Sequence, residues 1–148
     1  MQKCTLALGC FWKPEENFKD KPGIIKTEVG YAGGKKPHVT YEEVCKGDTG
    51  HAEVVRLTFD EKIISYEKIL DLFFKMHDPT QKNMQFPDVG TQYRSEIFFE
   101  TEQQKQLALK IREKLKQNYN DKIETVISEF KNYCKAEDYH QKYIEKNR

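Results

Sequence analysis

The sequence lacks the features that mark a membrane-spanning or nucleic-acid-binding protein. None of its apolar runs approaches the ~20 residues of a transmembrane helix. Its 25 Lys and Arg residues face 24 Asp and Glu residues, and a net charge of +1 predicts no basic surface for nucleic acid. No repeat, low-complexity stretch or linker divides the 148 residues, so we expect one domain over residues 1–148. Because there are few apolar runs to expose, we also expect a monomer.

Cysteine is scarce as well, with four residues at Cys4, Cys10, Cys45 and Cys134. Their spacing contains no C-x-x-C pair and no zinc-ribbon pattern, so we expect neither a structural metal nor another cofactor. The apolar stretch from Thr5 onward is too short for a secretion signal and leads directly into charged sequence. We therefore expect a cytoplasmic protein whose cysteines remain thiols.

Aromatic residues make up 12% of the chain and compensate for a hydrophobic fraction of only 37%, so a packed core is expected. Strand patterns and helical spacings follow one another in the order β-α-β-β-α-β-α-β. This order predicts an α+β protein, a two-layer α/β sandwich with a ferredoxin-like mixed sheet and helices packed on it. The expected strands cover 3–8, 24–31, 51–59, 94–100 and 125–130; the expected helices begin near 14, 66 and 102, and residues 32–50 and 80–92 are expected to be loops.

Cys10 is the first candidate for chemistry, because it follows a strand and a glycine and precedes a helix start. The positive end of a helix dipole lowers the pKa of a nearby thiol, which predicts a reactive thiolate. The alternative is a small buried side chain, with Phe11 and Trp12 beside it in the core.

Glu53 is the second candidate, since Ala52 on one side and Val54 on the other place it in an apolar strand. A buried carboxyl group stays protonated and can donate a proton near neutral pH. The alternative is a carboxylate that faces solvent. His51, two residues earlier, is a candidate base or a structural histidine.

Two loops and the C-terminal segment supply the remaining candidates. Asp88 and Tyr93 lie in a loop and are able to point polar groups into a cleft, as is Tyr41 in the earlier loop. Their alternatives are a turn residue for Asp88 and core aromatics for the tyrosines. The segment 136–141 reads as a solvated helix, and its single Glu-x-x-His spacing is weak evidence for a metal.

Six short blocks, in order along nearly the whole chain, resemble the A-type peptide methionine sulfoxide reductases. They are Gly9-Cys10-Phe11-Trp12, Gly30-Tyr31-Ala32-Gly33-Gly34, Gly50-His51-Ala52-Glu53, His77-Asp78-Pro79-Thr80-Gln81, Gly90-Thr91-Gln92-Tyr93-Arg94-Ser95 and Ala136-Glu-Asp-Tyr-His-Gln141. The resemblance implies an α/β two-layer sandwich. It also implies a thiol-dependent enzyme that reduces the S epimer of methionine sulfoxide, free or in proteins, and so repairs oxidised proteins.

The same resemblance assigns a role to each candidate. It implies that Cys10 attacks the sulfoxide sulfur and becomes a sulfenic acid, and that Glu53 is the acid. The implied substrate-binding residues are Phe11 and Trp12 for the methyl group, Tyr41 and Tyr93 for the sulfoxide oxygen, and Asp88 for a water molecule.

Many members of that family carry resolving cysteines in a glycine-rich tail, whereas no cysteine follows Gln141 here. Cys4 lies roughly 20 Å from Cys10 along one extended strand and is too distant to resolve it. The remaining routes are Cys134, then Cys45, or direct attack by a thioredoxin-like or other thiol reductant.

Two rival functions remain from the residues alone. One is a different thiol enzyme, with Cys10 paired to a histidine. The other is a module that binds oxidised methionine without turnover.

Overall fold

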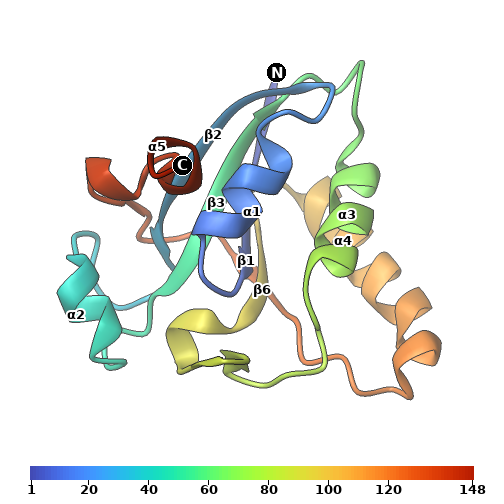
Figure 1. Ribbon diagram of the computed structural model, residues 1–148. Coiled ribbons are helices and arrows are strands. Elements are labelled where there is room, and N and C mark those ends of the chain that lie inside the picture. Colours follow the sequence, from blue (N-terminus) through green and yellow to red (C-terminus); the bar gives the residue numbers. More distant parts are fainter.

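The computed structural model describes residues 1–148 as an α+β fold built on one six-stranded sheet (Figure 1). The strands stand in the order β7-β6-β1-β3-β2-β8, and all neighbours are antiparallel except β6 and β7. Their bounds are β1 Gln2–Leu8, β2 Ile24–Ala32, β3 Ala52–Phe59, β6 Ser95–Phe99, β7 Val126–Glu129 and β8 Cys134–Lys135. A separate hairpin pairs β4 Met84–Gln85 with β5 Asp88–Val89.

Five α-helices and three short 3₁₀ turns complete the chain. The helices are α1 Trp12–Phe18, α2 Tyr41–Cys45, α3 Tyr66–Met76, α4 Glu102–Leu115 and α5 Tyr143–Lys146; the turns are Thr91–Tyr93, Lys116–Tyr119 and Asp138–His140. None of the helices has the length and apolar character needed to cross a bilayer. The expected α+β class with helices on a mixed sheet is confirmed.

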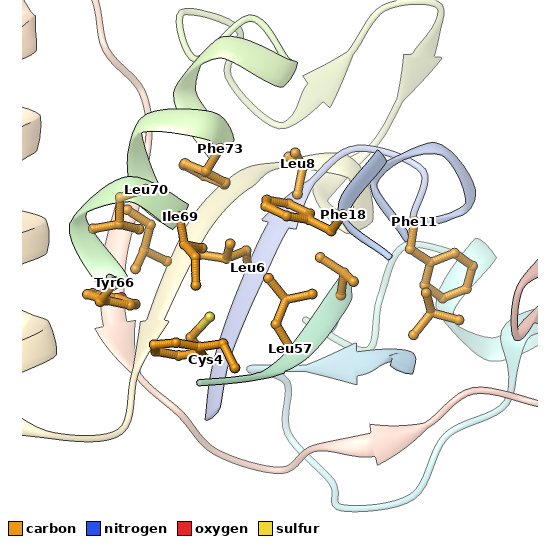
Figure 2. Close-up of a cluster of buried hydrophobic side chains, with 14 of the residues drawn as sticks. Cys4, Leu6, Leu8, Phe11, Phe18, Leu57, Tyr66, Ile69, Leu70 and Phe73 are labelled. Atoms are coloured by element: carbon orange, nitrogen blue, oxygen red, sulfur yellow. The ribbon is translucent and has the colours of Figure 1, made fainter. Parts of the chain in front are cut away.

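The larger core lies between the sheet and helices α1, α3 and α4 (Figure 2). Alternate residues of β1 point into it, and Cys4 and Leu6 are fully buried. The helix α3 adds Ile69, Leu70 and Phe73 at helical spacing, each fully buried. Burial of an aromatic or aliphatic side chain of this size stabilises the fold by about 1.5–3 kcal/mol.

The opposite face of the sheet carries smaller residues and a second, smaller cluster. Ala7, Ala52 and Val54 lie there, and Phe130 and Tyr133 pack against them. The guanidinium of Arg56 lies 4.5 Å from the centre of the Phe130 ring. Both faces of the central strands are therefore covered, which explains why β1 and β3 are buried along most of their length.

Helix α2 corrects the expectation that residues 32–50 form a loop. Thr40 is its N-cap, and the Thr40 side chain accepts a hydrogen bond from the Glu43 amide at 3.2 Å. The Glu43 carboxylate accepts one from the Thr40 amide at 3.0 Å, which completes a capping box. These paired caps explain why so short a segment is helical among glycines and prolines.

The other helix starts behave largely as their sequences predict. The Ser65 side chain accepts from the Lys68 amide and caps α3. The Thr101 side chain accepts from the Gln104 amide, as expected for a capping box at α4. The Gln104 side chain departs from the capping-box pattern. It accepts a hydrogen bond from the amide of Glu100, one residue before the cap, instead of from the amide of the cap residue.

Two further segments depart from expectation. Residues 80–92 contain the β4–β5 hairpin and the 3₁₀ turn Thr91–Tyr93 instead of an unstructured loop. The segment 136–141 forms a 3₁₀ turn packed against the protein, not a solvated helix, and Ala136 and His140 are buried.

Candidate active site

Cys10 lies in the turn between β1 and α1. The structure brings the seven expected site residues into the region of this turn: Cys10, Phe11, Trp12, Tyr41, Glu53, Asp88 and Tyr93. The preceding Gly9 has a φ of +94°, and a Cβ there would meet the Gln85 side chain at 3.0 Å. Glycine is therefore required both by the backbone and by the close approach of the β4–β5 hairpin. Cys10 itself is half-buried and free.

The thiol of Cys10 is not the low-pKa thiolate that its position predicts. Burial raises the pKa of Cys10 to about 12, and the negative charges of Glu53 and Asp88 also raise it. A backbone hydrogen bond from Trp12, at the start of the helix, lowers the pKa but is outweighed by burial. In the resting protein Cys10 is therefore a protonated thiol.

Glu53 is a buried acid, as expected, with a side chain only 1% exposed. It shares the face of β3 that carries Val55, and its Oε1 accepts a hydrogen bond from the Phe11 amide at 3.2 Å. Burial raises the pKa of Glu53 to about 8, against the lowering effect of that hydrogen bond. A carboxyl group with this pKa holds its proton at neutral pH and releases it above about pH 8.

Two tyrosines on different elements feel the charge of Glu53. Tyr41 is the first residue of α2, and Tyr93 ends the 3₁₀ turn before β6. Burial raises the pKa of each, and the charge of Glu53 raises both further, so the two hydroxyl groups lie within electrostatic reach of the carboxyl group. Both hydroxyls stay protonated at neutral pH and can donate hydrogen bonds.

Asp88 approaches Cys10 from the β4–β5 hairpin. The two residues line one cavity of about 360 Å³, together with Lys13, Asn17 and Phe86. The charge of Asp88 also raises the pKa of Glu53 and Tyr93. Asp88 therefore belongs to the same constellation as the buried acid and the thiol.

Phe11 and Trp12 differ in how they are held. Phe11 is 1% exposed and belongs to the main core, with its ring 5.6 Å from Tyr31. Trp12 is only partly buried and begins α1. The Trp12 Nε1 donates a hydrogen bond to His140 Nδ1 at 2.9 Å, and its ring stacks on Tyr143 at 3.8 Å.

The candidate base His51 and the buried His140 both have other partners. His51 Nε2 lies 2.7 Å from the Lys36 carbonyl oxygen, so this residue holds a loop. His140 Nδ1 accepts from Trp12. Neither histidine makes a hydrogen bond to Cys10, and the structure contains no group of His, Cys, Asp and Glu able to hold a metal ion.

Sequence reasoning missed the contribution of the segment around Glu137. One Glu137 carboxylate oxygen accepts from the Tyr31 hydroxyl at 2.8 Å, and the other accepts from the Tyr41 amide at 2.9 Å. His140 and Tyr143 contact Trp12. The aromatic residues spaced through this polar segment were the available signal, because a solvated helix does not need them.

The four cysteines are free, and two of them bear on how Cys10 is recycled. Cys45 is the last residue of α2 and is exposed. Cys134 lies in β8 at the sheet edge, with its Sγ 3.5 Å from the Val39 carbonyl oxygen.

The chain is similar to known proteins along nearly its whole length. The family model "Peptide methionine sulfoxide reductase" matches residues 2–148. A Pelagibacter ubique protein named peptide methionine sulfoxide reductase MsrA is 56% identical over 146 residues, which are 99% of each chain. The reduced form of Mxr1 from Saccharomyces cerevisiae superposes with a TM-score of 0.92 at 41% identity, covering 99% of this chain and 85% of the other. A structure of Mxr1 in complex with Trx2 gives a TM-score of 0.67 at 28% identity, covering 96% and 84%.

Proposed function

This chain belongs to the peptide methionine sulfoxide reductase family, and on that premise we propose roles for its site residues. It is a peptide-methionine (S)-S-oxide reductase, which reduces methionine sulfoxide by thiol chemistry. The observation that carries the proposed roles is a buried, neutral Glu53 whose carboxyl oxygen meets the Phe11 amide directly after Cys10.

Cys10 is the nucleophile and Glu53 the acid. A sulfoxide oxygen is a poor leaving group until it is protonated, and Glu53 supplies that proton. Once Glu53 has given its proton to the sulfoxide oxygen, the Glu53 carboxylate accepts the proton of the Cys10 thiol. The Cys10 sulfur then attacks the sulfoxide sulfur. The pair therefore exchanges protons as one coupled unit, which suits a thiol with a raised pKa beside an acid with a raised pKa.

The overall step transfers one oxygen atom. The sulfur–oxygen bond of the sulfoxide breaks, methionine sulfur gains two electrons, and Cys10 sulfur loses two to become a sulfenic acid. A thiol then attacks Cys10 and releases water, and a second thiol restores Cys10 as a disulfide leaves.

The surrounding residues bind the sulfoxide. Tyr41 and Tyr93 donate hydrogen bonds to its oxygen, where negative charge develops in the transition state. Phe11 and Trp12 enclose the methyl group on the sulfur. Asp88 holds a water molecule in the cavity that it shares with Cys10.

The reductant is a thioredoxin-like protein or another thiol. The yeast Mxr1 structure in complex with Trx2 supports a thioredoxin-like partner. An external thiol attacks the Cys10 sulfenic acid directly, and the internal alternatives are Cys134 and then Cys45.

Several broader features complete the proposal. The inner strands β6-β1-β3-β2, all antiparallel and connected through α1 and α3, support the ferredoxin-like description. Residues 1–148 act as one domain and as a monomer, and the family match over residues 2–148 supports the single domain. The need for thiol reductant supports a cytoplasmic location.

The test is turnover of the separated S and R epimers of N-acetyl methionine sulfoxide with dithiothreitol as reductant. The proposal expects release of methionine from the S epimer alone, and none from either epimer with Cys10→Ser. A Cys10→Ser variant that reduces the S epimer at the wild-type rate would remove Cys10 from the reaction. Binding of the S epimer without turnover by the unchanged protein would favour a binding module.

A further inference from the structure

We propose that His140 and Tyr143 are positioning residues that hold the Trp12 indole and so set the size of the pocket for the sulfoxide's alkyl group. This inference rests on the proposed function, because it takes Trp12 as one wall of that pocket. It assigns a task to two residues of the C-terminal segment that take no part in the chemistry.

The two walls of the pocket need different kinds of support. Phe11 is packed in the main core at 1% exposure, so neighbours on every side fix its ring. Trp12 is at the first position of α1, a seven-residue helix; it packs against that core but stays partly exposed. A large side chain that is not enclosed samples several rotamers, and holding one of them has an entropic cost.

Trp12 is instead held at its edge and on its face. The His140 Nδ1 accepts the indole N–H at 2.9 Å, which fixes the rotation of the ring in its own plane. The Tyr143 ring stacks on the indole with centres 3.8 Å apart and planes 9° apart, which fixes the tilt. One directional contact and one planar contact together define a single orientation.

The state of His140 supports this reading. The ring is 1% exposed, and because Nδ1 accepts from Trp12, the proton of the neutral ring is on Nε2. That Nε2 is buried and has no hydrogen-bond partner. An unpaired buried donor destabilises a fold. If His140 contributed only packing, a phenylalanine at this position would therefore stabilise the fold more. The accepting Nδ1 is the feature that an apolar ring lacks.

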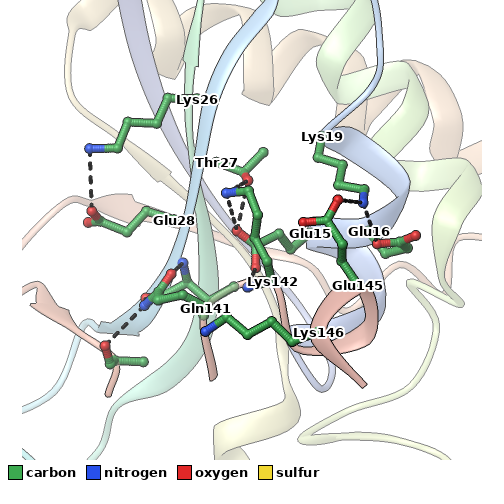
Figure 3. Close-up of polar contacts among 12 residues, drawn as sticks. Glu15, Glu16, Lys19, Lys26, Thr27, Glu28, Gln141, Lys142, Glu145 and Lys146 are labelled. Carbon is green, nitrogen blue, oxygen red and sulfur yellow. Dashed lines mark hydrogen bonds and ion pairs between the residues drawn. The ribbon is translucent and has the colours of Figure 1, made fainter. Parts of the chain in front are cut away.

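The segment that carries these residues is itself firmly attached. The Gln141 side chain accepts from the Val29 amide at 2.9 Å and donates to the Val29 carbonyl at 2.8 Å, as a strand neighbour would. The Lys142 amide donates to the buried Glu15 carboxylate on α1 at 2.6 Å, and the Thr27 hydroxyl donates to the same group (Figure 3). The support for Trp12 is therefore anchored to both β2 and the helix that Trp12 begins.

The experiment compares variants that remove the two contacts with variants that keep them. His140→Phe keeps a ring but loses the acceptor, and His140→Asn restores an acceptor oxygen at the place of Nδ1. Tyr143→Leu removes the stacking, and Tyr143→Phe keeps it. Glu145→Gln is the matched control. It changes a residue of the same C-terminal segment and weakens the ion pair between Glu145 Oε1 and Lys19 Nζ, which are 2.7 Å apart, without touching Trp12.

The first readout is the fluorescence of Trp12, the single tryptophan of the chain. We expect acrylamide to quench Trp12 more strongly in His140→Phe and Tyr143→Leu than in the unchanged protein. The two conservative variants and Glu145→Gln should match the unchanged protein. This readout needs no turnover, so it shows whether Trp12 is held in place regardless of activity. If the chain reduced neither epimer, that result would refute the proposed function but not the positioning of Trp12.

The second readout is single-turnover reduction of methionine S-sulfoxide and of its S-ethyl analogue. For the methyl substrate, loss of the His140 contact should raise the half-saturating concentration about fivefold, the equivalent of ~1 kcal/mol, with the maximal rate nearly unchanged. The preference for methyl over ethyl should fall by a similar factor, and His140→Asn should restore it.

Three results would overturn the inference. The first is a folded His140→Phe with unchanged quenching of Trp12. The second is an unchanged methyl-to-ethyl preference in both His140→Phe and Tyr143→Leu. The third is a lower maximal rate at unchanged half-saturation, which would give His140 a chemical role. If His140→Phe fails to fold, Tyr143→Leu decides, because Tyr143 belongs to no buried cluster.

Discussion

Replacement of Glu53 by glutamine should lower activity. It should also make the variant increasingly more stable than the unchanged protein as the pH rises. The carboxyl group is 1% exposed, and burial raises its pKa to about 8 from an ordinary value of 4.5. Glutamine has nearly the same shape, stays neutral at every pH, and can still accept the hydrogen bond from the Phe11 amide. The variant therefore removes only the ionisation.

The sign and size of the stability effect follow from proton linkage. In the unfolded chain Glu53 loses its proton above pH 4.5, whereas in the folded protein it keeps the proton up to about pH 8. The unfolded state thus binds fewer protons in this window, and the stability contributed by Glu53 is complete below it and is lost as the pH rises through it. The slope of about 1.4 kcal/mol per pH unit gives a loss of about 3 kcal/mol between about pH 5 and pH 7.

Urea unfolding followed by circular dichroism measures this directly. The free energy of unfolding of Glu53→Gln minus that of the unchanged protein should grow by about 3 kcal/mol from about pH 5 to pH 7 and level off above about pH 8. All other titrating groups cancel in the difference. A difference that stays constant across this range would mean that Glu53 titrates normally, and the argument for a neutral acid would be refuted.

The same variant separates stability from catalysis. A positioned general acid contributes about 10²- to 10⁴-fold to rate, so single-turnover reduction by Glu53→Gln should be slower by at least about 10². In the unchanged protein the rate should fall as the pH rises through about 8, where Glu53 loses its proton. The variant should lack this fall.

Three other predictions can be checked with single variants. Tyr41→Phe and Tyr93→Phe should each slow the reduction step by about tenfold or more, because each removes a donor to the developing oxyanion; equal single-turnover rates would exclude that role. After one turnover without added thiol, peptide mapping should find no Cys10–Cys134 disulfide, and Cys134→Ser should recycle with dithiothreitol at the wild-type rate; a slower rate would restore Cys134 as the resolving residue. Phe73→Ala should lower the free energy of unfolding by about 3–5 kcal/mol because it empties a fully buried site; a loss under about 1 kcal/mol would contradict the packing described.

Much of the fold follows from patterns within single segments. The periodicity of Ile69, Leu70 and Phe73 after the Ser65 cap predicts α3, because core burial and helix geometry demand the same spacing. Glu53 is predictable for a similar reason, since apolar neighbours on both sides mark a strand buried on both faces. Helix α2 had a local signal too, in the Thr40 to Glu43 capping box, which the surrounding glycines and prolines obscured.

What the sequence does not reveal depends on contacts between distant segments. The pKa of Cys10 is set by burial and by Glu53 and Asp88, which reach it from β3 and from the β4–β5 hairpin, and these outweigh the local helix effect. The segment near His140 looks polar, but its polar groups are satisfied by partners more than a hundred residues away, such as Trp12 and Val29. A local pattern cannot report such pairings.

The central claim is that the Cys10 thiol accepts the oxygen of methionine S-sulfoxide, and mass spectrometry after one turnover tests it most directly. The protein is mixed with one equivalent of the S epimer without reductant, trapped with dimedone, and digested. The account predicts one methionine released per chain and the sulfenic acid adduct on Cys10, with the R epimer giving neither. Release of methionine while Cys10 remains an unmodified thiol, with no disulfide formed, would contradict it.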